Sequence, residues 1–112
     1  QTMNKLSTIS LTIDSKTDIK AVQFTEVSKE QMLAINKYLG AQAFQEEHLD
    51  DIIEGFNDGD ELIPLFYKNG DVSWIDLNDW VFVAEGEVHA VCTITSLFDN
   101  MTEMVINELS NE

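Results

Sequence analysis

Acidic side chains dominate the ionisable residues of this sequence, and that imbalance limits how the chain can fold. It has 21 Asp and Glu against six Lys and Arg, a formal charge of −15 over 112 residues. Chains with so much net charge stay disordered unless they also hold enough apolar residues for a core. Hydrophobic residues make up 44% here, too many for a disordered acidic tail. We therefore expect a single folded domain over residues 1–112 with a strongly negative surface.

The charge also limits which partners the chain can bind. Nucleic acids and anionic lipids require Lys or Arg to neutralise their phosphates. All six bases are lysines that precede residue 69, and only acids follow Lys68 among the charged residues. No apolar run approaches the ~20 residues needed to span a bilayer. We expect no direct nucleic-acid binding and no membrane partner.

The single cysteine and the first residues bear on where the chain works. Cys92 cannot form a disulfide within the chain, and the N-terminus lacks the basic, apolar and small-residue order of a signal peptide. These features favour a reducing cytoplasm. Cys92 follows Val91 in an apolar stretch with no base nearby, which predicts a buried, unreactive thiol. Gln1 and Thr2 precede Met3, where we expect the native chain to start.

Two strands are predicted near the N-terminus. In Leu6–Ile13 apolar residues alternate with small hydroxyl residues, the period-two pattern of a half-buried strand. A polar turn over Ser15–Asp18 leads to a second strand at Ile19–Thr25. The residues of this second strand alternate between two faces, with Ile19, Ala21, Gln23 and Thr25 on one and Lys20, Val22 and Phe24 on the other.

Two helices are predicted next. Ser28 is a favourable N-cap, Gln31 completes a capping box, and Gly40 ends the first helix. Its apolar stripe consists of Met32, Leu33, Ile35 and Leu39. A second helix is predicted over Ala41–Phe56, and the polar run 57–60 breaks it. The apolar positions of the second helix are Phe44, Leu49, Ile52, Ile53 and Phe56.

Two hairpins are predicted after these helices. Asn69-Gly70 lies between the runs LIPLFYK and DVSWID and supplies the positive φ that a type I′ turn requires. Pro64 favours an edge position for the first of these strands. The second hairpin is expected to pair Trp80–Ala84 with Glu87–Ile94 around Glu85-Gly86.

A last helix completes the fold. Ser96 is expected to cap a helix over Leu97–Leu109. The shared apolar face of this helix is Leu97, Met101, Met104, Val105 and Leu109. The order of elements predicts an α+β fold with a largely antiparallel sheet of about five to six strands and two to three helices.

The densest group of acids lies in residues 46–61, named here the acidic segment. Its eight carboxylates are Glu46, Glu47, Asp50, Asp51, Glu54, Asp58, Asp60 and Glu61. A calcium-binding EF-hand loop has acids at its first, third and fifth positions before a glycine. With Gly59 as that glycine, Phe56 takes the third position and Leu65 the twelfth, so the motif fails.

Three interpretations of the acidic segment remain open. It is an ordinary solvated helix face with a turn, an irregular cation site, or a face that binds a partner. In the last case, carboxylates along a helix can be spaced like the phosphates of a duplex, about one charge per 1.7 Å of axis. Such a protein would occupy the basic groove of a nucleic-acid enzyme as a DNA mimic.

Residues for catalysis or metal binding are sparse. His48 and His89 are far apart and do not have zinc-ligand spacing, so we expect both near the surface or turns and no metal site. No P-loop, dinucleotide or serine-nucleophile pattern is present, and without Arg the usual clamp for phosphate substrates is missing. Two converging carboxylates remain the one catalytic arrangement left open. We expect no enzyme activity, no catalytic residue and no cofactor.

Aromatic residues gather in the strand-rich region, at Phe66, Tyr67, Trp74, Trp80 and Phe82. A core rich in aromatics accounts for them. However, period-two alternation directs some of them outward, and exposed aromatics beside acids are typical of protein interfaces. The alternative hypothesis is therefore a structural or assembly module that self-associates through these strands, and a homodimer also remains open.

Several short motifs recur in one kind of protein. The run Ile19–Thr25 precedes a helix ending Tyr38-Leu39-Gly40, and the motifs Asn78-Asp79-Trp80-Val81, Gly86-Glu87 and Phe98 follow later. In this order they resemble small uncharacterised phage and prophage proteins, over most of the chain. The chain departs from that pattern at Asn78, where those proteins have Gly, and in the acidic segment. The resemblance implies a phage-encoded accessory protein in the host cytoplasm, without established site residues.

These observations favour an acidic binding protein that is not an enzyme. We expect the eight carboxylates of the acidic segment to act together by charge on a basic protein partner. The expected partner is a nucleic-acid-handling or defence protein, which the chain would inhibit or sequester.

Overall fold

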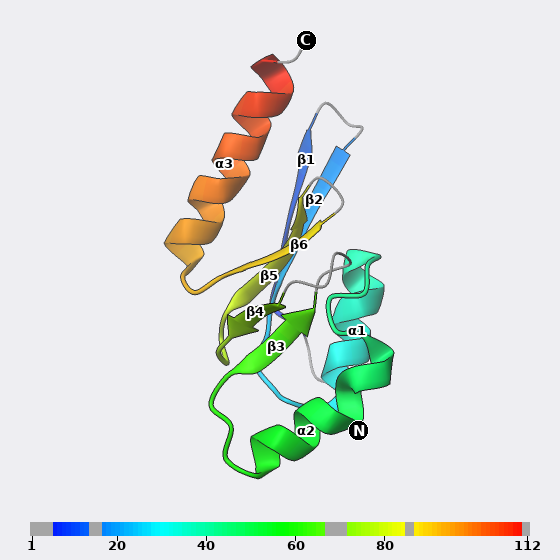
Figure 1. Ribbon diagram of the computed structural model, residues 1–112. Helices are drawn as coiled ribbons and strands as arrows, with labels where there is room; N and C mark the ends of the chain where they lie inside the picture. The colour runs from blue at the N-terminus through cyan, green and yellow to red at the C-terminus, as the bar shows by residue number, and fades with distance from the viewer. Residues whose placement is uncertain (1–5, 14–16, 67–71, 85–86, 111–112) are drawn as a thin grey trace.

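The computed structural model describes residues 6–13, 17–66, 72–84 and 87–110, which form a mixed α and β fold (Figure 1). In chain order the elements are β1 (Thr8–Ile13), β2 (Thr17–Gln23), α1 (Lys29–Leu39), the 3₁₀ helix η1 (Glu46–His48), α2 (Leu49–Asn57), β3 (Ile63–Phe66), β4 (Val72–Ile75), β5 (Trp80–Ala84), β6 (Glu87–Val91) and α3 (Ile94–Ser110). Four strands pair in the order β1-β2-β5-β6, all antiparallel, and β3 pairs with β4. The predicted α+β class is confirmed, with the six strands divided between two sheets.

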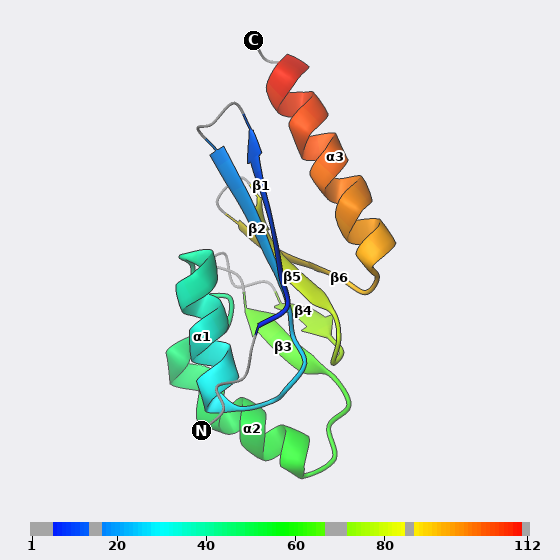
Figure 2. The same cartoon turned by 180° about the vertical axis from the view of Figure 1, so that it is seen from behind.

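The four-stranded sheet separates two hydrophobic clusters. The strand β2 contributes to both, because Ile19 and Ala21 face one cluster while Val22, on the opposite side of the pleat, faces the other. β5 does the same, with Val81 in one cluster and Phe82 in the other. Figures 1 and 2 show α3 on one side of this sheet, and α1, α2 and the β3–β4 hairpin on the other. The central strands are therefore apolar on both faces, as the predicted alternation in β2 requires.

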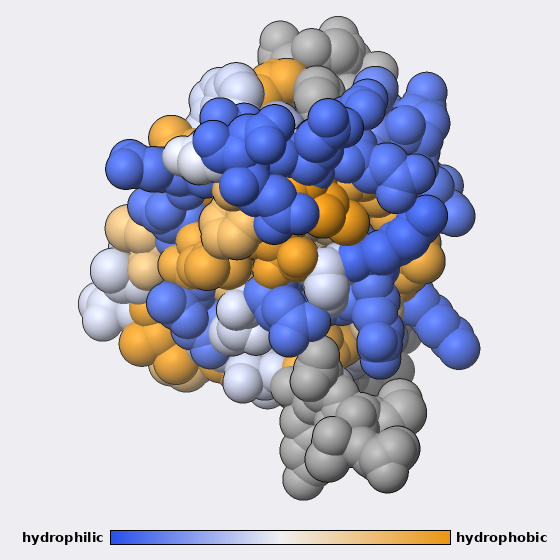
Figure 3. Space-filling model, turned by 90° about the horizontal axis from the view of Figure 1, so that it is seen from below, coloured by the Kyte–Doolittle hydropathy of each residue, from blue (hydrophilic) through white to orange (hydrophobic). Residues whose placement is uncertain are grey.

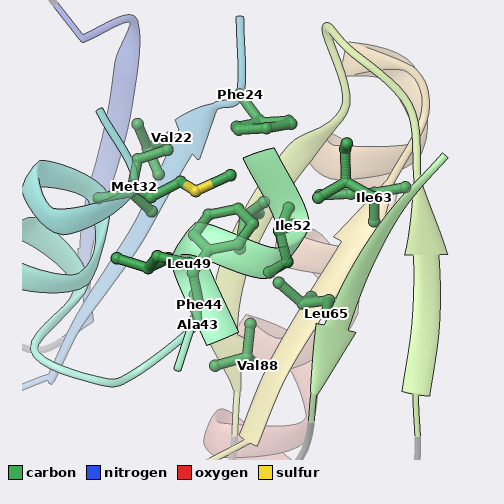
Figure 4. Packing of buried hydrophobic residues seen from close by; sticks show 13 residues of the cluster. Val22, Phe24, Met32, Ala43, Phe44, Leu49, Ile52, Ile63, Leu65 and Val88 are labelled. Atoms are coloured by element: carbon green, nitrogen blue, oxygen red, sulfur yellow. The ribbon is translucent and has the colours of Figure 1, made fainter. Parts of the chain in front are cut away.

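The larger cluster fixes α1, α2 and the β3–β4 hairpin to the sheet (Figure 4). Phe24, just after β2, packs against Phe44 with ring centroids 5.1 Å apart. Met32 of α1, Leu49 of α2 and Leu65 of β3 are fully buried in the same cluster. The buried side chains of α2 therefore hold this short helix against the rest of the protein.

The start of α1 agrees with the prediction in part. Ser28 is the N-cap, and its Oγ accepts a hydrogen bond from the Gln31 N–H at 3.1 Å. The reciprocal bond of a capping box is absent, because the buried Gln31 amide instead accepts from the backbone N–H groups of Thr25 and Glu26, at 3.0 and 2.9 Å. Gln31 thus ties the end of β2 to α1. Gly40, in the left-handed region with φ 71°, ends the helix as predicted.

The predicted helix over Ala41–Phe56 is wrong in its first half. Helical structure begins only at Glu46, in η1, and α2 starts at Leu49. The cause lies in α1, where the side chain of Asn36 donates to the Phe44 carbonyl at 2.6 Å and accepts from the Phe44 N–H at 2.9 Å. Both backbone groups of Phe44 are therefore used outside a helix, and its ring enters the core.

Both predicted strand pairs form. The second has the register of a two-residue turn, with Ala84 opposite Glu87, whereas in the first Phe66 lies opposite Val72, one residue out from the register that a two-residue turn at Asn69-Gly70 requires. Pro64 lies opposite Trp74 in the two-stranded sheet, so β3 is an edge strand as predicted. β5 and β6 pair from Trp80 with Val91 to Ala84 with Glu87. The turns Asn69-Gly70 and Glu85-Gly86 lie outside the described residues. So do Gln1, Thr2, Tyr67 and positions 15–16 of the first predicted turn. The last residues of that turn, Thr17 and Asp18, belong to β2.

The final helix begins earlier than predicted. β6 ends at Val91, so Ile94 is the first residue of α3 and not part of a strand. The capping side chain is Thr93, whose Oγ1 accepts from the Ser96 N–H at 3.0 Å, and Ser96 lies within the first turn. Leu97 and Met101 are buried against the sheet as expected. The side chains of Val105 and Leu109 lie outside the described part. No described helix is long and apolar enough to cross a membrane.

Candidate functional site

The acidic segment lies at one end of the molecule, on η1, α2 and the loop that leads to β3. All eight of its carboxylate side chains, Glu46, Glu47, Asp50, Asp51, Glu54, Asp58, Asp60 and Glu61, are exposed. Figure 3 views the molecule from this end and shows hydrophilic side chains over most of the face, with hydrophobic residues exposed between them. The acids that are grouped in the sequence are therefore all at the surface, on consecutive elements of the chain.

Little basic charge offsets this surface. The segment itself holds no Lys. Lys29, in the first turn of α1, lies 3.3 Å from Asp50 through its Nζ and the Asp50 Oδ1. These two side chains are 58% and 84% exposed, so water screens the pair and leaves Asp50 accessible. Among the described residues, Lys29 is the one lysine in an ion pair with the acidic segment, so the segment keeps a strong negative field.

The end of α2 folds the chain back on itself. Gly59 has φ 112° and donates its N–H to the Phe56 carbonyl at 3.1 Å, while the Asp60 N–H bonds the Gly55 carbonyl at 3.0 Å. This pair of hydrogen bonds is the Schellman motif, which requires a residue that tolerates positive φ. The turn predicted to break the helix thus directs Asp60 back toward α2.

A pocket of about 250 Å³ lies between this turn and the β3–β4 hairpin. Its wall includes the carboxylates of Asp51 and Asp60 and the aromatic ring of Trp74. Leu62 and Pro64 supply the apolar part of the wall, and His48 also lines it. The pocket therefore combines acids from the acidic segment with apolar side chains from a different part of the chain.

The aromatic residues of the strands divide between core and surface. Trp80 and Phe82 are 7% and 3% exposed and pack with α3, whereas Trp74 is 61% exposed. Alternation along β4 explains the difference, since its neighbour Ile75 points into the core. The side chains of Phe66 and Tyr67 lie outside the described part. Alternation alone indicated that some aromatics face outward, but only the fold places Trp74 beside the acids.

The two histidines occupy different environments. His48 is half-buried in η1, at the pocket. His89 is half-buried within β6, and its ring stacks on Phe82 with centroids 5.5 Å apart. Among the described residues, no three His, Cys, Asp or Glu side chains gather closely enough to hold a metal ion.

Cys92 contradicts the sequence-based prediction. The prediction of a buried thiol assumed that the strand continues to Ile94. Because β6 ends at Val91, Cys92 lies in the connection to α3, and its side chain is exposed and forms no disulfide.

The one catalytic arrangement left open, a pair of converging acids, has a counterpart in Asp51 and Asp60. Both line the same pocket, but both are solvent-exposed. A second pocket of about 190 Å³, beneath α3, has Glu103 as its one lining carboxylate.

Comparison with protein-family models, with curated proteins and with solved structures finds no match to this chain.

Proposed function

We propose that this chain is a non-enzymatic binding protein of phage or mobile-element origin that acts in the cytoplasm on a basic protein. The observation that carries the proposal is that all eight carboxylates of the acidic segment, on η1, α2 and the loop to β3, are exposed. Exposed acids repel one another, and a basic partner that binds them gains attraction from every one. Binding to such a surface is fast and strongly dependent on salt.

The spacing of the acids supports a target that normally binds nucleic acid. Asp50, Asp51 and Glu54 lie on α2, and a rise of about 1.5 Å per residue puts the three charges within about 6 Å of helix axis. The average spacing is then about 3 Å along the axis, close to the spacing of about 3.4 Å between charges along one strand of a DNA duplex. A groove lined with Lys and Arg for phosphates would therefore accept α2. Occupying that groove inhibits the partner by excluding its nucleic acid.

The test begins with capture of the partner from a lysate of the source organism, followed by measurement of affinity for the purified partner. The proposal requires a basic partner, an affinity that falls steeply as salt rises, and competition by duplex DNA. A partner whose binding is indifferent to salt and to DNA would overturn it.

A charge-reversed variant locates the binding surface. Glu47→Lys, Asp51→Lys and Glu54→Lys together should remove binding. The matched control makes the same change in net charge with Glu87→Lys, Asp99→Lys and Glu103→Lys, which are exposed acids on β6 and α3. Equal losses in the two variants would mean that net charge, and not the acidic segment, drives binding.

A second function, self-association in an assembly, is supported by the outer side of α3. Ile94, Phe98 and Ile106 of this helix are 46%, 49% and 56% exposed, and exposed apolar side chains are common at protein interfaces. Trp80 and Phe82 are buried, and Trp74 is the one exposed aromatic among the described strand residues, so the exposed apolar side chains on α3 are an additional surface for self-association beside the aromatic strands. Size-exclusion chromatography at low and at high salt tests self-association. A dimer held by apolar contacts persists at high salt, whereas a monomer at both salt concentrations would refute this second function.

A further inference from the structure

We propose that the pocket between α2 and the β3–β4 hairpin holds an arginine side chain of the basic protein partner. The inference rests on the proposed function and names the group that the site recognises. It follows from the three kinds of surface that meet there: two carboxylates, an exposed indole ring and a short apolar wall. We call this pocket the arginine pocket.

The indole ring of Trp74 provides a flat surface for a cation. Its side chain is 61% exposed on β4, although burial of an aromatic ring is strongly favourable when a core is available. A guanidinium group stacks on tryptophan more favourably than on other aromatic rings. Leu62 and Pro64, on the same wall, lie where the methylene groups of an arginine would pack.

The carboxylates come from two elements and meet at the pocket. Asp51 lies on α2, and the Schellman turn after α2 brings Asp60 back to the same wall. Two acids beside a ring match the planar fork of guanidinium, whose donors bind carboxylates while its face stacks. The compact ammonium group of lysine cannot make both contacts as well, so the pocket favours arginine over lysine.

A glycine inside α2 keeps space for one of these carboxylates. Glycine is unfavourable within a helix compared with alanine, yet Gly55 occupies such a position. A Cβ added at Gly55 would lie 2.5 Å from the Asp60 Oδ2, so any other residue forces this carboxylate to move. Gly55 therefore fixes where the Asp60 charge lies without taking part in binding.

The first experiment uses peptides and the two tryptophans of the chain. NMR spectra of the indole N–H groups are recorded while the peptide acetyl-Gly-Arg-Gly-amide is added, and again with lysine or neutral citrulline in place of arginine. We expect the Trp74 signal to shift with arginine, less with lysine and not with citrulline. Trp80 is 7% exposed and serves as an internal control in every spectrum. Equal shifts with citrulline, or no shift with arginine, would overturn the proposal.

Variants then separate position from charge. Asp51→Asn with Asp60→Asn should weaken arginine-peptide binding about tenfold. The control pair Glu54→Gln with Asp58→Asn removes the same charge from exposed acids that do not line the pocket and should change affinity about twofold or less. If both pairs lowered the affinity equally, the peptide would respond only to the overall negative charge, and the arginine pocket would be wrong.

Gly55→Ala provides a variant with unchanged charge. It should retain or gain thermal stability, because alanine favours the helix and only a short side chain must move. It should nevertheless lower the affinity for the arginine peptide several-fold, since the Asp60 carboxylate is displaced. Normal peptide affinity in Gly55→Ala would show that the position of Asp60 is irrelevant and contradict the proposed geometry.

The full partner distinguishes this inference from the function on which it rests. If the arginine pocket is correct, Asp51→Asn with Asp60→Asn weakens binding of the partner more than the control pair Glu54→Gln with Asp58→Asn does. If the partner binds with the expected salt dependence but both pairs behave alike, the acidic-surface function holds and the arginine pocket is wrong. If binding of the partner ignores salt, the proposed function itself fails, whatever the peptide does.

Discussion

Asn36 is expected to decide where the acidic segment begins, and its replacement by alanine is a quantitative test of the fold. Its amide donates to the Phe44 carbonyl at 2.6 Å and accepts from the Phe44 N–H at 2.9 Å. These bonds hold the chain between α1 and η1 in a non-helical path. Phe44, fully buried beside Phe24, depends on that path to reach the core.

The magnitude follows from the two hydrogen bonds. Each such bond stabilises a fold by about 1 kcal/mol net, and leaving a buried partner unpaired costs about 1–3 kcal/mol. The pair is part-buried, so water reaches the freed groups to some extent and lowers that penalty. We expect Asn36→Ala to lower the free energy of unfolding by about 2–4 kcal/mol. This is a large share of the roughly 5–15 kcal/mol of a typical domain.

Urea unfolding, followed by circular dichroism, measures this loss as a lower midpoint at an unchanged m-value. Asn36→Asp keeps the acceptor for the Phe44 N–H but loses the donor, so it should lie between the wild type and Asn36→Ala. Gln42→Ala, at an exposed position of the same connection, should change stability by less than about 0.5 kcal/mol. If Asn36→Ala is as mild as Gln42→Ala, the two bonds do not define the path and the reasoning is refuted.

Three further predictions test the remaining parts of the fold. Leu97→Ala should reduce stability by about 2–5 kcal/mol in urea unfolding, because Leu97 is fully buried between α3 and the sheet; a loss near zero would show that α3 does not pack there. Thr93→Ala should lower stability by about 1 kcal/mol through loss of the cap of α3, whereas Thr93→Ser should retain most of it; equal effects would exclude the capping bond. Cys92 should react with a thiol reagent in the native protein as fast as in urea, and strong native protection would contradict its exposure.

Local signals predicted those parts of the fold that depend on neighbouring residues. Ser28 and Gly40 bound α1 as expected, because a cap and a left-handed glycine act within one turn of the helix. The alternation of β2 likewise predicted its two faces. The exposure of the acidic segment followed from the cost of burying unpaired carboxylates.

Long-range contacts explain where sequence-based prediction failed. The apolar spacing around Phe44 fits a helix, but the amide of Asn36, eight residues earlier, fixes that backbone in another conformation. Gln31 was predicted to complete a capping box and instead bonds the end of β2. The arginine pocket was missed because Trp74 is distant in sequence from Asp51, and only the pairing of β3 with β4 brings its ring to the acids.

The most direct test of the proposed function is the salt dependence of binding between this chain and its purified partner, by titration calorimetry at several ionic strengths. The account predicts that affinity falls steeply and linearly on a logarithmic scale, and that Glu47→Lys, Asp51→Lys and Glu54→Lys together abolish binding while the control on β6 and α3 does not. An affinity that is unchanged by salt, or that survives the charge reversal of the acidic segment, would contradict it.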